Sequence, residues 1–389
     1  MRYHITDDGP KRCVAKPGNC QYEHFTDENE ATEYYEAKME KASNLHRGLT
    51  KATVKKNPPR LADDLTGNLE ELASTKAGYA KLEKCIDTRL EITKTMSDAL
   101  EERDPYNPDS AQPVKKTVFK ELKKDFNAYR DRTAQMVEQS ENSPHKVRSY
   151  AEMEDTSVVG SARLVDSFEP NTREWLEGRQ DTVGGSDVGA LVTMDFKPEE
   201  EQTYFDRQGL KRAEDSKSYP LTDEDLAKSQ RMSRGGAGPL YRGTVWEDRI
   251  RDRFAEDHSE LTVINTKGQY ANPDRSWQQV NFDGILTRDG KTHEGILEIK
   301  TSGSRETWAN GVPLNYRGQT LYYLNATGLK YAKVRVCIND NEHRDYTLHA
   351  DDEVAPGSGV KMEDYVKNRV EPWFRGLQAS RKEAMRSGS

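Results

Sequence analysis

The sequence predicts an α/β core in its C-terminal part, preceded by an all-α region. Two observations predict this division. Residues 60–103 and 115–140 repeat apolar side chains at three- and four-residue steps, which is the spacing of amphipathic helices. From about residue 165, helical and strand patterns alternate, with glycine-rich turns between them. A chain of 389 residues is long enough for two or three such units.

Composition excludes several classes of protein. Charged residues make up 32% and hydrophobic residues 33% of the chain, and no apolar run approaches the length of a membrane helix. The first residues contain no apolar segment of the kind that a secretory signal needs. Four scattered cysteines fit a reducing compartment, so we expect a cytoplasmic protein. The net charge of −8 argues against a generally basic nucleic-acid coat but allows a local basic groove.

Residues 1–45 form a small N-terminal segment followed by a predicted helix. Cys13, Cys20 and His24 lie close together in sequence, which is compatible with a zinc site. The usual pair of closely spaced cysteine knuckles is absent, so a small packed turn is the alternative. Whether these residues bind metal stays open.

Residues 46–145 are predicted to form a helical hairpin or a coiled-coil arm. The proline-rich sequence at 104–113 separates the two helical stretches, 60–103 and 115–140. Such an arm can bind a partner or mediate oligomerisation, and it can equally be a helical domain that packs on itself. Residues 146–164 then form a predicted linker to the α/β part at 165–389.

The sequence GILEIKTS at 295–302 places two charges inside an apolar strand. Alternation puts Glu298 and Lys300 on one face, with Leu297 and Ile299 on the other. Charges on a central strand are costly unless they are paired or bound. A solvated salt bridge near a sheet edge is one interpretation, and a metal-dependent active site is the other.

Asp283 favours the active site. Asp289-Gly290 predicts a tight turn, so 277–287 and 292–301 are expected to be antiparallel neighbours. This hairpin brings Asp283 close to Glu298. Two adjacent carboxylates disfavour ionisation, and a divalent cation such as Mg²⁺ reverses that penalty. Lys300 beside them can orient or deprotonate a water, or stabilise charge on a phosphate.

Three further blocks point toward the same site. Residues 241–258 are helical, and Glu247 shares their apolar stripe with Ile250 and Phe254; it is either a ligand or a rim residue. The helix expected at 313–328 begins at a proline and places Gln319 one turn from Tyr323.

The third block is the sequence RQDTVGGSDVGALV at 179–192. It predicts a helix capped by Ser186. A helix start that follows glycines is a ready anion site.

Together these blocks resemble the YqaJ and lambda-exonuclease type of the PD-(D/E)xK nuclease superfamily, over roughly residues 170–380. Phe282 stands where the family has proline, and Gly318 stands where it has a first glutamine. The matching residues are Trp175, Arg179, VGGSDVGAL, Gly243, Glu247, Asp283, Leu297–Lys300 and Gln319.

The resemblance implies a restriction-endonuclease-like core, in which a central mixed sheet is flanked by helices. It implies that Asp283 and Glu298, with a main-chain carbonyl near Ile299, hold one or two Mg²⁺ or Mn²⁺ ions. Glu247 would support the second ion. Lys300 would orient the attacking water or act as base, and Gln319 would fix Lys300 or the nucleophile.

The resemblance also implies a DNA substrate. Arg179 and Ser186 would bind the 5′ phosphate of a duplex end, and Tyr323 would also contribute to DNA binding. Family members commonly degrade one strand from the 5′ end for a single-strand annealing partner, in phage-type recombination. They are often trimeric rings. The expected location is the cytoplasm of a bacterial or phage-infected host cell.

A basic stretch at 226–246 suits phosphate contacts. It carries Lys228, Arg231, Arg234 and Arg242 and no acid, although an exposed loop with incidental charge is the alternative. Residues 195–225 are expected to form an insertion or lid.

Beyond the core, 331–338 and 343–350 are predicted strands, and 358–385 is a predicted helix. Cys337 is expected to be buried. It is the one cysteine after the core, which excludes the iron–sulfur variant of this nuclease type.

Three functions remain in competition: an exonuclease, an endonuclease of DNA defence or restriction, and a non-catalytic DNA-binding scaffold. The intact Asp283, Glu298 and Lys300 count against the scaffold. Strand polarity, oligomeric state, the partner and the purpose of the helical arm stay open.

Overall fold

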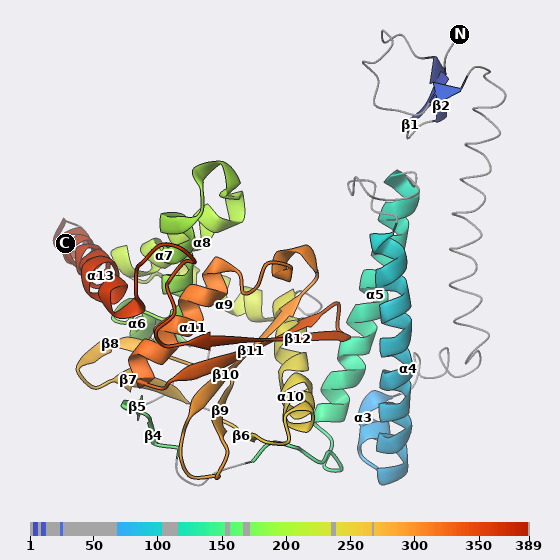
Figure 1. Cartoon of the computed structure of the whole chain (residues 1–389), viewed down its shortest axis with the longest axis horizontal. Helices are drawn as coiled ribbons and strands as arrows, with labels where there is room; N and C mark the ends of the chain where they lie inside the picture. The colour runs from blue at the N-terminus through green and yellow to red at the C-terminus, as the bar shows by residue number, and fades with distance from the viewer. Residues whose placement is uncertain are drawn as a thin grey trace. The chain divides into compact units, whose positions relative to one another are not determined.

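The computed structural model divides the chain into two compact units. One comprises Met1–Lys146 with Asn339–Asn341, and the other comprises Val147–Ile338 with Glu342–Ser389 (Figure 1). The structure describes residues 3–6, 9–12, 24–25, 68–102, 116–151, 156–165, 172–234, 239–266 and 268–387. None of the described helices is long and apolar enough to span a membrane.

The first unit contains a small antiparallel sheet and three described helices. Its strand order is β2-β1-β3, and His24 lies in β3, whereas Cys13 and Cys20 lie outside the described residues. The elements are β1 (Tyr3–Thr6), β2 (Gly9–Arg12), β3 (His24–Phe25), α3 (Leu69–Ala73), α4 (Lys76–Glu101) and α5 (Lys116–Glu141).

The prediction of a single helix over 60–103 is wrong. In the described part of that range the chain forms two helices, α3 and α4. Thr75 adopts an extended conformation between them, and its side chain accepts a hydrogen bond from the amide of Gly78. Threonine is a favoured N-cap residue, so its hydroxyl starts a new helix here. The spacing of the apolar residues alone does not reveal this break. The second predicted helix, 115–140, is confirmed as α5.

α4 and α5 pack against each other in an antiparallel pair around a buried arginine. Arg89 donates from Nε to Thr133 Oγ1 at 2.9 Å and from Nη2 to the carbonyl of Tyr129 at 3.0 Å. Its guanidinium also lies 3.9 Å from the centroid of the Tyr129 ring. This explains how a fully buried charge is tolerated in the helical unit.

The second unit is built on two sheets. Five strands in the order β12-β11-β10-β9-β6 form a mixed sheet, in which β10 and β11 are parallel, and four strands in the order β4-β5-β7-β8 form an antiparallel sheet. The strands are β4 (Val158–Val159), β5 (Ala162–Val165), β6 (Thr262–Ile264), β7 (Gln269–Asn272), β8 (Arg275–Val280), β9 (Gly284–Thr287), β10 (Gly295–Ser302), β11 (Tyr331–Ile338) and β12 (Glu342–His349).

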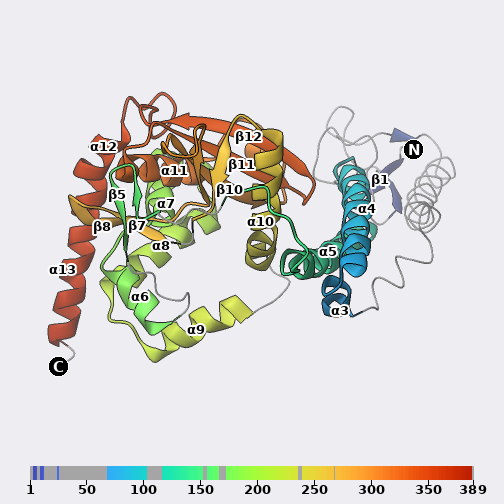
Figure 2. The same cartoon turned by 90° about the horizontal axis from the view of Figure 1, so that it is seen from below.

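Helices cover both faces of the mixed sheet. α10 contacts β6, β10 and β11, α11 contacts β8, β10, β11 and β12 from the other side, and α7 packs on α11 (Figure 2). The expected class is therefore confirmed: a central mixed sheet flanked by helices, preceded in sequence by a helical region. The helices are α6 (Arg173–Gln180), α7 (Gly185–Phe196), α8 (Tyr204–Ser218), α9 (Asp223–Arg234), α10 (Pro239–Asp257), α11 (Leu314–Thr327), α12 (Met362–Tyr365) and α13 (Glu371–Ser387).

The continuous strand predicted over 277–287 is wrong. The chain leaves the antiparallel sheet after β8 and enters the mixed sheet at β9, so residues 281–283 belong to neither. Phe282 drives this crossing, because its ring is almost fully buried and stacks on Tyr270 at 5.2 Å between centroids. Burial of Phe282 leaves Asp283 at the entrance to β9.

Three other predicted segments differ from expectation in their boundaries or secondary structure. The predicted linker, 146–164, contributes β4 and most of β5, which turn on Gly160 with a φ of 60°. The predicted lid at 195–225 is largely helical. The predicted C-terminal helix, 358–385, begins at Met362 and contains a π-helical turn at Val366–Val370 before α13. Strand β11 is confirmed with Cys337 buried on it.

Close approach of α7 and α11 fixes the centre of this unit. A Cβ added to Gly189 would lie 2.2 Å from the carbonyl oxygen of Asn315, so only glycine fits this crossing. Gly318 on α11 also lies close to Val192 on α7, where an added Cβ would meet the Val192 side chain at 2.9 Å.

We expect Gly189→Ala to lower the free energy of unfolding by about 1–3 kcal/mol, because the added methyl forces the two helices apart. Gly209→Ala in α8 is the matched control, since its nearest neighbour is a side-chain carbon at 3.7 Å. That substitution should leave stability unchanged or raise it by about 0.5–1 kcal/mol. Urea denaturation of the two variants tests this, and equal effects would contradict it.

Candidate active site

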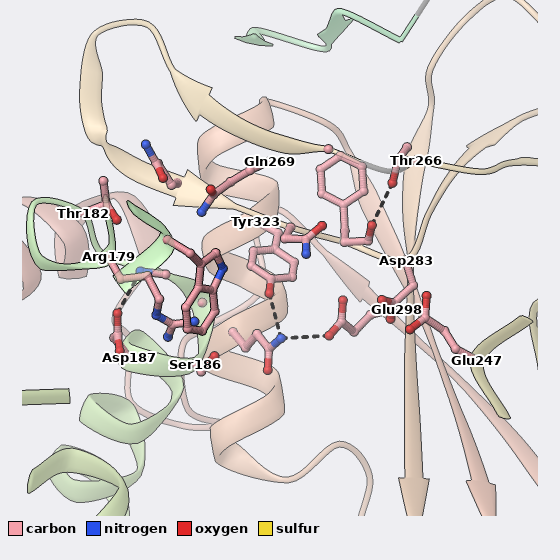
Figure 3. A pocket seen from close by; sticks show the side chains of 18 of the residues that line it. Arg179, Thr182, Ser186, Asp187, Glu247, Thr266, Gln269, Asp283, Glu298 and Tyr323 are labelled. Carbon is pink, nitrogen blue, oxygen red and sulfur yellow. Dashed lines mark hydrogen bonds between the residues drawn. The ribbon is translucent and has the colours of Figure 1, made fainter. Parts of the chain in front are cut away.

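A cavity of about 550 Å³ opens beside the mixed sheet, lined by α6, α7, α10, α11 and the β7–β8 strands. Carboxylates gather at one end, and an arginine stacked on a tryptophan lies at the other (Figure 3). The predicted residues that line it are Trp175, Arg179, Ser186, Glu247, Asp283, Glu298, Lys300, Gln319 and Tyr323.

Asp283 is held by the backbone of β10. Its amide donates to the carbonyl of Leu297 at 3.0 Å, and its Oδ2 accepts from the amide of Ile299 at 2.6 Å. Burial raises the pKa of Asp283, although Lys300 and the Ile299 amide oppose that rise. The carboxylate is thus fixed in orientation while its ionised form is destabilised.

Glu298 lies on the face of β10 that α11 covers. Its Oε1 pairs with Lys300 and accepts from Gln319 Nε2 at 2.8 Å, while Oε2 is buried without a hydrogen-bond partner. Burial, with a contribution from Asp283, raises the pKa of Glu298 to about 8. A buried carboxylate oxygen without a hydrogen-bond partner is energetically costly, so Glu298 Oε2 is available to bind a ligand.

Lys300 is a cation in this arrangement. Burial alone would lower the pKa of Lys300, but the carboxylates of Glu298 and Asp283 raise it above its ordinary value. The ammonium also lies 5.1 Å from the centroid of the Tyr316 ring. A lysine with a raised pKa is a poor general base, so the geometry favours an electrostatic or orienting role.

Glu247 reaches the cavity from α10 and is held by Arg251 one turn later. Arg251 Nη2 contacts Glu247 Oε1 at 2.5 Å, and its Nε donates to the carbonyl of Asp283 at 2.8 Å. Burial and the negative charge of Asp283 raise the pKa of Glu247 to about 7. Arg251 is itself almost fully buried, and it connects Glu247 to the backbone of Asp283, just before β9.

This donor set fits a hard divalent cation. Three carboxylates resist ionisation together, and one buried carboxylate oxygen lacks a partner; a cation with oxygen ligands relieves both penalties. Within the described residues, no three His, Cys, Asp or Glu side chains already converge on a single point.

The other end of the cavity combines Arg179 with the start of α7. The Arg179 guanidinium lies 4.7 Å from the centroid of the Trp175 ring. The prediction that Ser186 caps α7 is wrong, because Gly184 occupies the N-cap and Ser186 lies in the first turn. Asp187 accepts from the Gly184 amide at 2.9 Å, which completes the cap from inside the helix. Ser186 still lines the cavity.

Gly185, at the start of α7, lies against two cavity residues of α11. A Cβ at this position would lie 2.3 Å from the Tyr323 ring and 2.8 Å from the Gln319 side chain. Gln319 Nε2 donates to Tyr323 Oη at 2.7 Å as well as to Glu298. The expected role of Gln319 is to fix Lys300 or the nucleophile; in the structure it contacts Glu298, which itself pairs with Lys300, and Tyr323.

Of the predicted basic surface, only Arg242 has a described side chain. Arg242 lies in the first turns of α10 and is not among the residues that line the cavity. Lys228, Arg231 and Arg234 belong to α9, and their side chains lie outside the described residues.

Sequence reasoning missed several residues that shape the site. The acid three positions after the N-cap glycine is a capping signal that identifies Asp187. Arg251 follows Glu247 by one helical turn, and this spacing predicts an ion pair. No local signal identifies the remaining lining residues, which come from other elements: Thr182, Thr266, Gly268, Gln269, Gln279 and Asn281.

Residues 174–330 match the model of the YqaJ-like viral recombinase domain. Over these residues the chain is similar to that domain. The resemblance predicted from the sequence is confirmed over these residues, and all the lining residues named above lie within them.

Two solved structures are similar to the chain. One is an alkaline exonuclease (LHK-Exo) from Laribacter hongkongensis, 18% identical with a TM-score of 0.39, and the match covers 56% of this chain and 98% of that one. The other is LHK-Exo in complex with dAMP, 17% identical with a TM-score of 0.38 and the same coverage. No curated protein matches the chain.

The raised pKa of Glu298 in the YqaJ-like domain makes stability depend on pH. The folded state holds a proton on Glu298 that the unfolded state releases near its ordinary value of 4.5. Stability should therefore fall as pH rises from about 5 to about 8, and the contribution of Glu298 should level off above that pH. Melting temperatures measured in EDTA at pH 6 and pH 9 should differ more for the wild type than for Glu298→Gln.

The exposed Glu201→Gln serves as the control for that comparison and should behave like the wild type. A pH profile of Glu298→Gln as steep as that of the wild type would show that Glu298 is not the titrating group.

Proposed function

We propose that the protein is a Mg²⁺-dependent deoxyribonuclease that degrades duplex DNA from an end, with 5′-to-3′ polarity. One observation carries the proposal: a single cavity has three carboxylates and a lysine at one end and an arginine with a helix start at the other. The YqaJ-like domain supports it, because the matched residues carry both ends.

The carboxylate end suits phosphodiester hydrolysis. Asp283 and Glu298 would hold Mg²⁺, with Glu247 as a third ligand, and the ion would polarise the phosphate and lower the pKa of its bound water. Lys300 keeps its proton and stabilises negative charge that develops on the phosphate. Gln319 holds Glu298 in place through Oε1, which leaves Oε2 directed to the ligand.

The arginine end suits a terminal phosphate. Arg179 can form charge-assisted hydrogen bonds to phosphate oxygens, and the first turn of α7 offers amides and the Ser186 hydroxyl. An anion site at a fixed distance from the carboxylates selects a chain end over an internal phosphate. This supports an exonuclease over an endonuclease, and we propose that the 5′ end of the DNA enters the pocket.

The wild type should degrade linear duplex DNA with 5′-phosphorylated ends in Mg²⁺ and leave a covalently closed circle of the same sequence intact. Lys300→Ala should slow degradation at least 100-fold, because the cation that stabilises the phosphate is lost. The matched control is Lys330→Ala, an exposed lysine between α11 and β11, which should keep wild-type activity.

Gel analysis of end-labelled DNA measures both rates and the order in which products appear. Cutting of the circle would favour the endonuclease. No cleavage of either substrate by folded protein would remove the catalytic proposal.

Mg²⁺ binding can be measured without turnover. We expect Mg²⁺ to raise the melting temperature of the wild type at pH 8, because the ion relieves repulsion among Asp283, Glu298 and Glu247. Glu298→Gln should lose most of that rise, and the exposed Glu201→Gln should keep it. An equal rise in all three proteins would place the binding elsewhere.

A further inference from the structure

Lys217 is a buried lysine that the proposed reaction does not use. It lies in the last turn of α8, and its side chain is 1% exposed. An isolated buried ammonium is strongly unfavourable, so its partners must repay the loss of hydration. Both of its partners belong to the arginine end of the cavity.

The first partner is Asp187. Lys217 Nζ lies 2.9 Å from Asp187 Oδ2, and the same oxygen accepts the Gly184 amide at 2.9 Å. Although burial alone would raise the pKa of Asp187, Lys217 and Arg179 with the Gly184 amide lower it. Asp187 therefore stays ionised and holds the backbone turn at which α7 begins.

The second partner is the main-chain carbonyl of Arg179. Lys217 Nζ donates to this oxygen at 3.2 Å, in the last turn of α6. Gln180 adds a parallel contact, because its Nε2 donates to the carbonyl of Tyr219 at 2.8 Å just after α8. One ammonium thus joins the end of α6 to the start of α7.

We propose that Lys217 is a positioning residue that sets the arginine end of the cavity for a terminal phosphate, through Asp187 on α7 and the Arg179 carbonyl on α6. This inference rests on the proposed function and deepens it. Lys217 itself does not contact the DNA; it fixes the separation between the Arg179 guanidinium and the first amides of α7. Loss of the clamp should weaken end recognition and leave the carboxylate chemistry intact.

The test uses the full chain with Lys217→Met and Asp187→Asn combined, so that no buried charge is left without a partner. Asparagine keeps an acceptor for the Gly184 amide. The control is Lys211→Met on the same helix, whose ammonium is exposed and pairs with Asp215. The substrates are two DNA hairpins with one open end, carrying either a 5′ phosphate or a 5′ hydroxyl.

We expect the wild type and Lys211→Met to prefer the phosphorylated end at least 10-fold in kcat/KM. The double variant should lose that preference through a higher KM, with kcat at saturating DNA within about twofold of the wild type. A folded double variant that keeps the wild-type preference would overturn the inference. So would a variant in which kcat falls and KM does not change, because the carboxylate end would then depend on Lys217.

Binding of the same hairpins in EDTA separates this inference from the proposed function. Preferential binding of the phosphorylated hairpin by the wild type, lost in the double variant, supports the clamp even if no DNA is cleaved. Equal binding of both hairpins by the wild type overturns it, because there is then no phosphate site to position. Wild-type protein that binds the phosphate but cleaves nothing in Mg²⁺ removes the proposed function alone.

Hydrogen exchange of the wild type covers the case in which the double variant does not fold. The phosphorylated hairpin in EDTA should slow amide exchange at least threefold in residues 173–187 and also in 214–219, because the clamp connects the two segments. Slower exchange confined to 173–187 would overturn the inference.

Discussion

The second unit is organised around one costly arrangement: a carboxylate buried on a central strand. Glu298 cannot reach bulk solvent, because β9 and β11 flank β10 and α11 covers its face. Its only cation neighbour, among the described residues, is Lys300 two positions along the same strand. Burial raises the pKa of Glu298 to about 8, and the nearby carboxylates of Asp283 and Glu247 add to that rise.

Much of this site could be predicted from local sequence. Alternation in GILEIKTS separates Glu298 and Lys300 from Leu297 and Ile299, and the structure keeps that separation, with Glu298 contacting Gln319 of α11. Helical spacing also predicted that Glu247 shares a face of α10 with Ile250 and Phe254, which are buried, and Glu247 lines the cavity. These features depend on the period of one element, and one element is what a sequence pattern describes.

What could not be predicted depends on which elements meet. Residues 277–287 alternate like one strand, and nothing local says that Val280 ends one sheet and Gly284 begins another. The crossing depends on the packing of Phe282 on Tyr270, which lies on β7, twelve residues earlier in the sequence. Lys217 is thirty residues from Asp187 in sequence, and only the packing of α8 on α7 brings them together.

The same helix, α11, sets both ends of the cavity. Gln319 reaches Glu298 at the carboxylate end, while Tyr323 and Gln319 pack on Gly185 at the start of α7. The spacing between the two ends therefore depends on the position of α11 and on the absence of a side chain at Gly185. An enzyme that acts at a set distance from a chain end needs such a rigid spacing, because an error of about 1 Å in positioning can cost about 100-fold in rate. An endonuclease has no comparable need to couple an anion site to its carboxylates, so the contact of Gly185 with Tyr323 favours the end-dependent reaction.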